Sequence, residues 1–423
     1  MKSKSAGTAP LALVEYQDRA CAANQFRGAE AAVDQLRFGF FGEIGGVLAA
    51  VKKSHREISF GETATVHEEL GDALWYLATV AREYNHSLDA VGAAAIAELT
   101  QRYHPGNHPV SENLTFDQLD GLVAFCIRRI NEEPIEAHLQ RLGARAGELL
   151  ALKSDLASLG PVDALGRLLG DMVVVSALFK LKLKDIAIAN LEKFESRWPA
   201  ESKYRELFDG DMQPFEQFPR DFTMNFIERE AASGKRYVIQ QMNQVNIGDR
   251  LTDNVGEPDG YRFHDVFHLA YIAHLGWSPV IRALLKLKRK SNADLDENQD
   301  GARAMIIEEG IVAWIFNHAV DRDLFATAKP GKLEYGLLKQ VHDLVKGYEV
   351  ADCPLWQWER AILDGFKVFR EITAAGGGAV HVDLSKHTIE FKEIPRLGPN
   401  VDLPPRVKRT VIAGSTRPPI GPS

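Results

Sequence analysis

Cysteine is scarce in this sequence, and that scarcity limits the covalent and metal chemistry that the chain can support. The three cysteines, Cys21, Cys126 and Cys353, lie far apart and form no CxxC pair. A disulfide framework and a cysteine zinc site both need paired or clustered cysteines, so neither is supported. Free cysteines fit a reducing compartment, and we expect the protein to be cytoplasmic.

Two further absences narrow the range of partners. No apolar run approaches the roughly 20 residues that a membrane-spanning helix needs, so we expect no membrane partner. Basic residues are not in excess, because 50 lysines and arginines face 58 acids and the net charge is -8. A general nucleic-acid binder needs surplus cations for its phosphate contacts, so this class is excluded as well.

The chain is instead rich in amphipathic helical patterns. Apolar residues recur at three- and four-residue steps over 13–24, 40–54, 67–85 and 89–103. Alternating strand patterns are almost absent before residue 376. The predicted fold class is therefore all-α, with a small C-terminal β-hairpin and a disordered, proline-rich tail over 376–423. Residues 1–10 are interpreted as a disordered lead, because no signal-type apolar core follows their lysines.

The helical part contains an internal repeat. The segment "ELGDALWYLA" at 69–78 aligns with "LLGDMVVVSA" at 168–177, and the flanking helices align with gaps that fall in loops. We therefore predict two related repeats that pack as a pseudo-symmetric helical bundle, one over 11–108 and a degenerate one over 115–205. A further helical domain is predicted over 211–375.

The first repeat holds acids at metal-ligand spacing. Glu69 and Asp72 are three residues apart, so both carboxylates lie on one helix face. Glu43 lies on the preceding helix, but Gly46 stands where the second acid of an ExxE pair would be. Carboxylates from two facing helices suit magnesium, which prefers oxygen ligands. A solvated acidic helix face is the alternative interpretation, because such spacings also arise by chance.

At these motifs the sequence resembles the all-α NTP pyrophosphohydrolases of the MazG type. The likeness rests on "FGEIGGVLAAVKK", "EELGDALWYLA" and "IANLEKFESRW". The resemblance implies an enzyme that uses magnesium, or manganese in its place, to convert a nucleoside triphosphate into a monophosphate and pyrophosphate. It implies catalytic and metal-binding roles for Glu43, Glu69 and Asp72. It also implies phosphate or nucleotide contacts from Lys52, Lys53, Asn190, Lys193 and Arg197.

The second repeat departs from the family pattern. Glu148 stands at the place of Gly46 and Asp171 at that of Asp72, but Arg145 and Leu168 replace the other two acids. MazG-type proteins commonly assemble their sites between paired subunits, so a fused pair could keep one competent site and let its twin decay. Glu148 and Asp171 are therefore further metal-ligand candidates, with Glu148 either completing the first site or remaining as a relic.

The 211–375 block carries a second cluster of candidate ligands. His264 and His268 are one helical turn apart, Asp265 lies between them, and Glu308 and Glu309 follow on a later helix. Two histidines on one face can chelate a metal together with a carboxylate. Hydrogen-bonded histidines on a half-buried helix are the alternative. An HD-type phosphohydrolase is discounted, because no upstream histidine lies between 201 and 263. The block is similar to a C-terminal domain fused to some MazG-like proteins.

Three functions follow from these patterns. The leading one is a magnesium-dependent nucleotide pyrophosphohydrolase in nucleotide-pool control or defence, with a nucleoside triphosphate as its substrate. The second is a nucleotide-binding sensor or scaffold that has lost turnover with Gly46. The third is a hydrolase whose metal site lies at His264 and His268. A homo-oligomer is compatible with each of them, because apolar helix faces can pair between copies.

Overall fold

The computed structural model describes residues 10–22, 24, 26, 32–56, 61–103, 113–152 and 161–393. The predicted lead up to residue 9 and the predicted tail from 394 onward lie outside the described residues. The chain divides into two compact units. The first unit combines Met1–Phe208 with Thr327–Leu363, and the second combines Asp209–Ala326 with Asp364–Ser423. Each unit is described by itself below.

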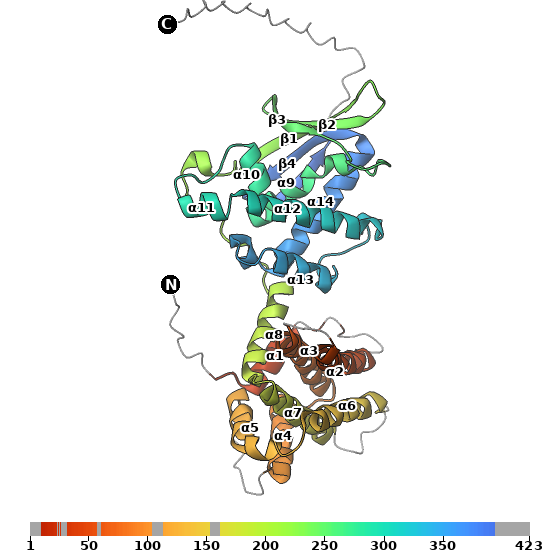
Figure 1. Cartoon of the computed structure of the whole chain (residues 1–423), viewed down its shortest axis with the longest axis vertical. Helices are drawn as coiled ribbons and strands as arrows, with labels where there is room; N and C mark the ends of the chain where they lie inside the picture. The colour runs from red at the N-terminus through yellow and green to blue at the C-terminus, as the bar shows by residue number, and fades with distance from the viewer. Residues whose placement is uncertain are drawn as a thin grey trace, which may run out of the picture. The chain divides into compact units, whose positions relative to one another are not determined.

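The helices of the first unit form two successive sets of four, drawn from red to olive in Figure 1. The first set comprises α1 (Leu13–Ala22), α2 (Ala32–Arg56), α3 (Glu62–Glu83) and α4 (Leu88–Tyr103). The second set comprises α5 (Phe116–Ile130), α6 (Ile135–Ala151), α7 (Pro161–Leu178) and α8 (Leu183–Arg197). These positions match the helical periodicity of the sequence, so the prediction of a mainly helical fold is confirmed.

The two sets exchange their last helices. Within each set the second and third helices pack together, α2 on α3 and α6 on α7. The fourth helices cross over, because α8 packs against α3 and α4 packs against α7. Glycines allow both approaches: a Cβ atom on Gly71 would lie 3.3 Å from Cβ of Asn190, and one on Gly166 would lie 2.5 Å from Cβ of Ala94. Two paired repeats would be expected to pack in this way. That the two sets are related in sequence remains a prediction.

A single apolar core runs through both sets. Leu70, Leu74, Leu169 and Val173 are fully buried in one continuous cluster. Burying each such side chain stabilises the fold by about 1.5–3 kcal/mol. Helices α3 and α7 both contribute to this cluster along much of their length, so the acids that α3 carries stand on a helix whose other sides are packed.

A third segment of the first unit comes from later in the chain. It contains α13 (Tyr335–Leu344), the short helix η4 (Glu349–Asp352) and the start of α14 (Leu355–Ala375). The Glu359 carboxylate accepts hydrogen bonds of 2.7 Å from the backbone amides of Gly331 and Leu333. These bonds hold the loop that leads into α13 and so position that helix.

The second unit contains an antiparallel five-stranded sheet in the order β3-β2-β1-β4-β5. The strands are β1 (Asp221–Glu230), β2 (Arg236–Met242), β3 (Val245–Leu251), β4 (Gly377–Asp383) and β5 (Thr388–Lys392). The predicted C-terminal hairpin is confirmed as β4 and β5. The 211–375 domain, predicted to be mainly helical, also contains strands over 221–251 that the sequence analysis did not identify. The signal was present in β1, where Phe222, Met224 and Phe226 alternate inward.

Helices cover this sheet. After η1 (Pro214–Glu216) and the strands come η2 (Tyr261–Phe263), α9 (Asp265–Leu275), α10 (Pro279–Leu284), α11 (Ala293–Asn298), α12 (Ala302–Val320) and η3 (Asp323–Phe325). Helix α9 packs on β4, β5 and α12 (Figure 1). Its Phe267 stacks on Phe369 of α14, with ring centroids 5.2 Å apart. Among the described residues, no helix has both the length and the apolar character to cross a membrane.

Candidate functional site

Three carboxylates lie along the facing helices α2 and α3. Glu43 of α2 is hydrogen-bonded to Glu69 of α3, and Asp72 lies one turn further along α3, near enough to act on the charge of Glu43. The Glu69 carboxylate occupies the space beside Gly46: a Cβ atom there would lie 2.3 Å from Glu69 Oε2. The position that lacks an acid is therefore filled by an acid from the facing helix, which pairs Glu43 with Glu69. Asp72 stands further along α3, and among the described residues the three carboxylates do not converge within 4.8 Å of one another.

Crowding changes the protonation of this cluster. Burial raises the pKa of Glu43 from 4.5 to about 8, and the hydrogen bond that protonated Glu43 donates to Glu69 and the charge of Asp72 add to the effect. Two adjacent carboxylates repel each other when both are charged, so Glu43 holds a proton more tightly than an isolated acid does, although the charge of Lys193 opposes this. A bound cation would compete for the same oxygens.

The crossing helix α8 supplies the basic and amide groups. Lys193 Nζ donates to both oxygens of Asp72, at 2.8 and 2.6 Å. Asn190 Nδ2 also donates to Asp72 at 3.1 Å, and its own carbonyl accepts a bond of 2.8 Å from Tyr16. Burial raises the pKa of Asp72 even though the Lys193 charge opposes this. The amide and the ammonium predicted from the sequence therefore both contact the cluster.

A polar pocket of about 300 Å³ opens beside Asp72, within the first unit. Its walls come from α3, α8 and α13. Lys339 forms an ion pair with Glu68, and Tyr335 donates to the same carboxylate at 3.2 Å. Burial alone would raise the pKa of Glu68, but the bond from Lys339 and the charge of Lys193 hold it below its ordinary value.

Sequence reasoning missed the α13 wall of this pocket. The α13 face presents Tyr335, Lys339 and His342, and Lys346 lies just beyond the helix. A usable signal existed, because these four residues recur at steps of four, three and four and so share one helix face. Nothing in the sequence says that this face meets α3 and α8, which lie more than a hundred residues earlier.

In the second set of helices, the acid at the position of Asp72 is paired with arginines. Asp171 of α7 accepts from Arg102 of α4 at 3.0 Å and from Arg145 of α6 at 2.8 Å. Arg145 also binds Glu98 at 2.9 Å. Asp171, predicted as a metal ligand, is thus neutralised by two arginines. A cation at this position would face their positive charges, so the site at Asp171 does not suit a metal.

Glu148, the other candidate ligand of the second repeat, is exposed on α6. It takes part in none of the ion pairs or hydrogen bonds found in the described part of the chain. The hypothesis that Glu148 completes the first site therefore has no supporting contact.

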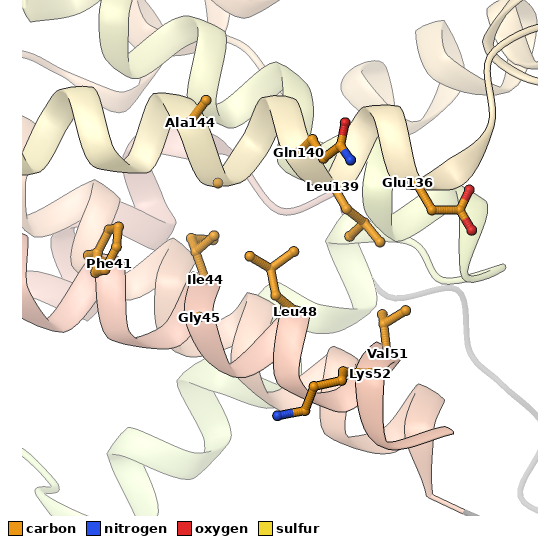
Figure 2. Close-up of a pocket in the computed structure, with 11 residues that line it drawn as sticks. Phe41, Ile44, Gly45, Leu48, Val51, Lys52, Glu136, Leu139, Gln140 and Ala144 are labelled. Carbon is orange, nitrogen blue, oxygen red and sulfur yellow. The ribbon is translucent and has the colours of Figure 1, made fainter. Parts of the chain in front are cut away.

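Lys52 and Lys53, predicted to bind phosphates, both lie exposed on α2. Lys52 lines a separate pocket of about 510 Å³ between α2 and α6, whose facing side chains are mostly apolar (Figure 2). Its amine points away from α6 in that view. Arg197 donates to the Leu333 carbonyl at 2.6 Å and lies over the Trp198 ring. Of the predicted phosphate ligands, Lys193 and Asn190 lie at the acid cluster.

The second predicted cluster lies in the other unit. His264 begins α9 and His268 follows one turn later, while Glu308 and Glu309 project from α12. His268 Nδ1 lies 2.7 Å from Glu308 and its Nε2 lies 3.6 Å from Glu309. Asp265 accepts from the buried Gln240 of β2 and lies 3.0 Å from His264 Nε2. All five residues predicted for this cluster are therefore brought together.

Comparison with known proteins identifies part of the chain. Residues 203–395 match the family model described as the MazG C-terminal domain. This confirms the resemblance seen in that region and suggests a MazG-related, nucleotide-handling protein. The match does not extend over residues 1–202, which hold the acid cluster. No curated protein and no solved structure matches the chain.

Proposed function

Because residues 203–395 form a MazG C-terminal domain, we propose that the chain is a magnesium-dependent nucleoside triphosphate pyrophosphohydrolase of the cytoplasm. The products would be pyrophosphate and a nucleoside monophosphate. One observation carries the proposal: Glu43 is hydrogen-bonded to Glu69 between α2 and α3, and Asp72 lies one turn further along α3, next to a pocket that contains lysines.

The donor set fits magnesium. Glu43, Glu69 and Asp72 offer only carboxylate oxygens, the ligands that this ion prefers alongside substrate phosphates and water. The raised pKa of Glu43 beside Glu69 reflects a concentration of negative charge that a divalent cation would relieve. When bound there, magnesium would neutralise triphosphate oxygens and help to generate the water nucleophile.

The protein's own residues would orient the substrate. Lys193 is the cation nearest to the acids, and a triphosphate that enters the pocket would compete with Asp72 for it. Asn190 is held in one orientation by Tyr16, so its amide is ready to fix a ligand position. Lys339 and Lys346 line the same pocket and would attract the anionic chain.

A specific observation supports the second candidate, a nucleotide sensor without turnover. The Lys193 ammonium already binds both oxygens of Asp72, and Gly46 leaves the cluster one acid short of the ExxE pattern. A site neutralised by its own lysine could bind a nucleotide without hydrolysing it. Binding without turnover would favour this function over the first.

The test is magnesium-dependent pyrophosphate release from a panel of canonical and modified NTPs and dNTPs. We expect turnover by the wild type and a much lower rate in Asp72→Asn. The loss of rate should exceed the roughly 10–100-fold effect of removing a residue that only hydrogen-bonds to a metal ligand. Glu148→Gln is the matched control, since it changes an exposed acid of the second repeat and should leave the rate unchanged. Equal rates in wild type and Asp72→Asn would refute the proposal.

A further inference from the structure

The His264 cluster converges on one point in the second unit. One ligand atom each from His264, His268 and Glu309 lies within 4.8 Å of the other two. Glu309 Oε2 lies 3.9 Å from His264 Nε2 and 3.6 Å from His268 Nε2. These separations are only slightly longer than those between neighbouring ligands at bond lengths of about 2.0–2.2 Å. A small rotation of the Glu309 side chain would close the difference.

The hydrogen bonds of the two rings fix which nitrogen faces this point. His264 Nδ1 lies 2.8 Å from the Tyr261 carbonyl, and a carbonyl can only accept, so Nδ1 carries a proton. His268 Nδ1 donates in the same way to Glu308 at 2.7 Å. Metal-binding histidines almost always donate their second ring N–H to such a group. In both residues, Nε2 is the nitrogen that faces Glu309. His264 Nε2 also lies 3.0 Å from Asp265 Oδ1, so a metal ion at this point would replace that contact.

The side chains that hydrogen-bond to the candidate ligands are buried and have fixed partners. Glu308 has no exposed side-chain surface, and its second oxygen accepts from the Val280 amide at 2.8 Å. His268 is fully buried, and its Nε2 faces Glu309 Oε2 at 3.6 Å, just beyond the usual length of a hydrogen bond, which leaves the nitrogen incompletely satisfied. A buried polar nitrogen that is incompletely satisfied is unfavourable, so the geometry calls for a ligand at this atom.

We propose that His264, His268 and Glu309 bind one divalent transition-metal ion, independently of the nucleotide site in the first unit. Two imidazoles and one carboxylate select zinc, iron or manganese over magnesium, because imidazole is a softer ligand than oxygen. Three protein ligands leave at least one coordination position for solvent or a substrate. The Glu309 side chain is 45% exposed, so this position can be reached from solution.

The alternative to a metal ion at this point is a proton on His268. A protonated His268 would bridge Glu308 and Glu309 as an ion pair and would satisfy the same geometry without a metal. The two alternatives differ in a direct measurement, because only the metal site binds a stoichiometric ion through nitrogen ligands.

The experiment uses the full chain with Asp72→Asn in every sample, which weakens the first-unit site. Metal is removed with a chelator, and Zn²⁺ and Mn²⁺ are then titrated by calorimetry, with Mg²⁺ as the comparison ion. Co²⁺ is added to a parallel sample, because its visible absorption reports nitrogen coordination. Glu309→Gln and His264→Gln remove one ligand each. His318→Ala, a histidine elsewhere on α12, is the matched control.

We expect one equivalent of Zn²⁺ to bind to the parent and to His318→Ala. Each ligand variant should lose at least about tenfold in affinity, together with the Co²⁺ absorption. Glu309 is half-exposed, so Glu309→Gln should fold, and thermal unfolding without metal checks this; if it does not fold, His264→Gln decides. Equal affinity in the parent and in the folded ligand variants, or no stoichiometric binding by the parent, would overturn the proposal in favour of the protonated ion pair.

Discussion

The Nζ atom of Lys193 lies 2.6 Å from Oδ2 of Asp72, although the two residues are 121 positions apart. The contact exists because α8, from the second helical set, packs against α3 of the first. It gives Asp72 a partner whose removal should affect substrate binding and catalysis more than folding.

Replacing Lys193 by methionine tests this role. The variant removes the charge nearest to the acids, and we expect kcat/KM for the triphosphate to fall roughly tenfold or more. Steady-state pyrophosphate release measures the effect. The control is Lys184→Met on the same helix, which breaks only a half-exposed pair with Asp117. Equal losses in the two variants would show that helix charge in general, not this contact, sets the rate.

Gly46 offers a second test at the acid cluster. A methyl group there would overlap the Glu69 carboxylate, the mobile end of a side chain, so Gly46→Ala should displace Glu69 while the fold persists. We expect weaker Mg²⁺ dependence of activity, seen as a higher magnesium concentration at half-maximal rate. Gly45→Ala is the control, because its added methyl group meets nothing within 4 Å. Unchanged magnesium dependence in Gly46→Ala would show that Glu69 is not a magnesium ligand.

The protonation of Glu43 predicts a pH effect on stability. Its pKa is raised from 4.5 to about 8, so the folded state binds a proton that the unfolded state releases. The stability from this group is fully present below about pH 4.5 and is lost as the pH rises through about 8.

In a chelating buffer, wild-type stability should therefore fall over this range more than that of Glu43→Gln, which keeps a neutral side chain. Denaturant unfolding at several pH values measures the difference. Parallel curves for the two proteins would mean that Glu43 is charged throughout.

Arg145 gives a prediction about stability alone. Its guanidinium binds Asp171 and Glu98, both largely buried, so Arg145→Ala should cost about 1.5–3 kcal/mol in the free energy of unfolding. Pyrophosphate release should be unchanged. Arg82→Ala, which breaks an exposed pair with Asp18, should cost no more than about 1 kcal/mol. A loss of activity in Arg145→Ala would assign the second set a direct part in turnover.

The helices and the acid trio could be predicted because their signals are local. Helical periodicity gave α1–α8, and the three-residue step gave Glu69 and Asp72 a common face. The α13 wall could not be predicted, because its meeting with α3 depends on packing between distant segments. Strand β1 did carry a usable alternation, whereas β2 and β3 did not: the buried Gln240 interrupts the apolar pattern of β2, and no residue of β3 is buried.

The exchange of α4 and α8 makes the two helical sets mutually dependent for folding. The last helix of each set packs against the third helix of the other set. Neither set alone therefore contains both the acids and Lys193, and neither alone forms the whole apolar core. The eight helices should therefore unfold in one cooperative transition. A gene cut between α4 and α5 should yield two fragments that are soluble only when they are expressed together.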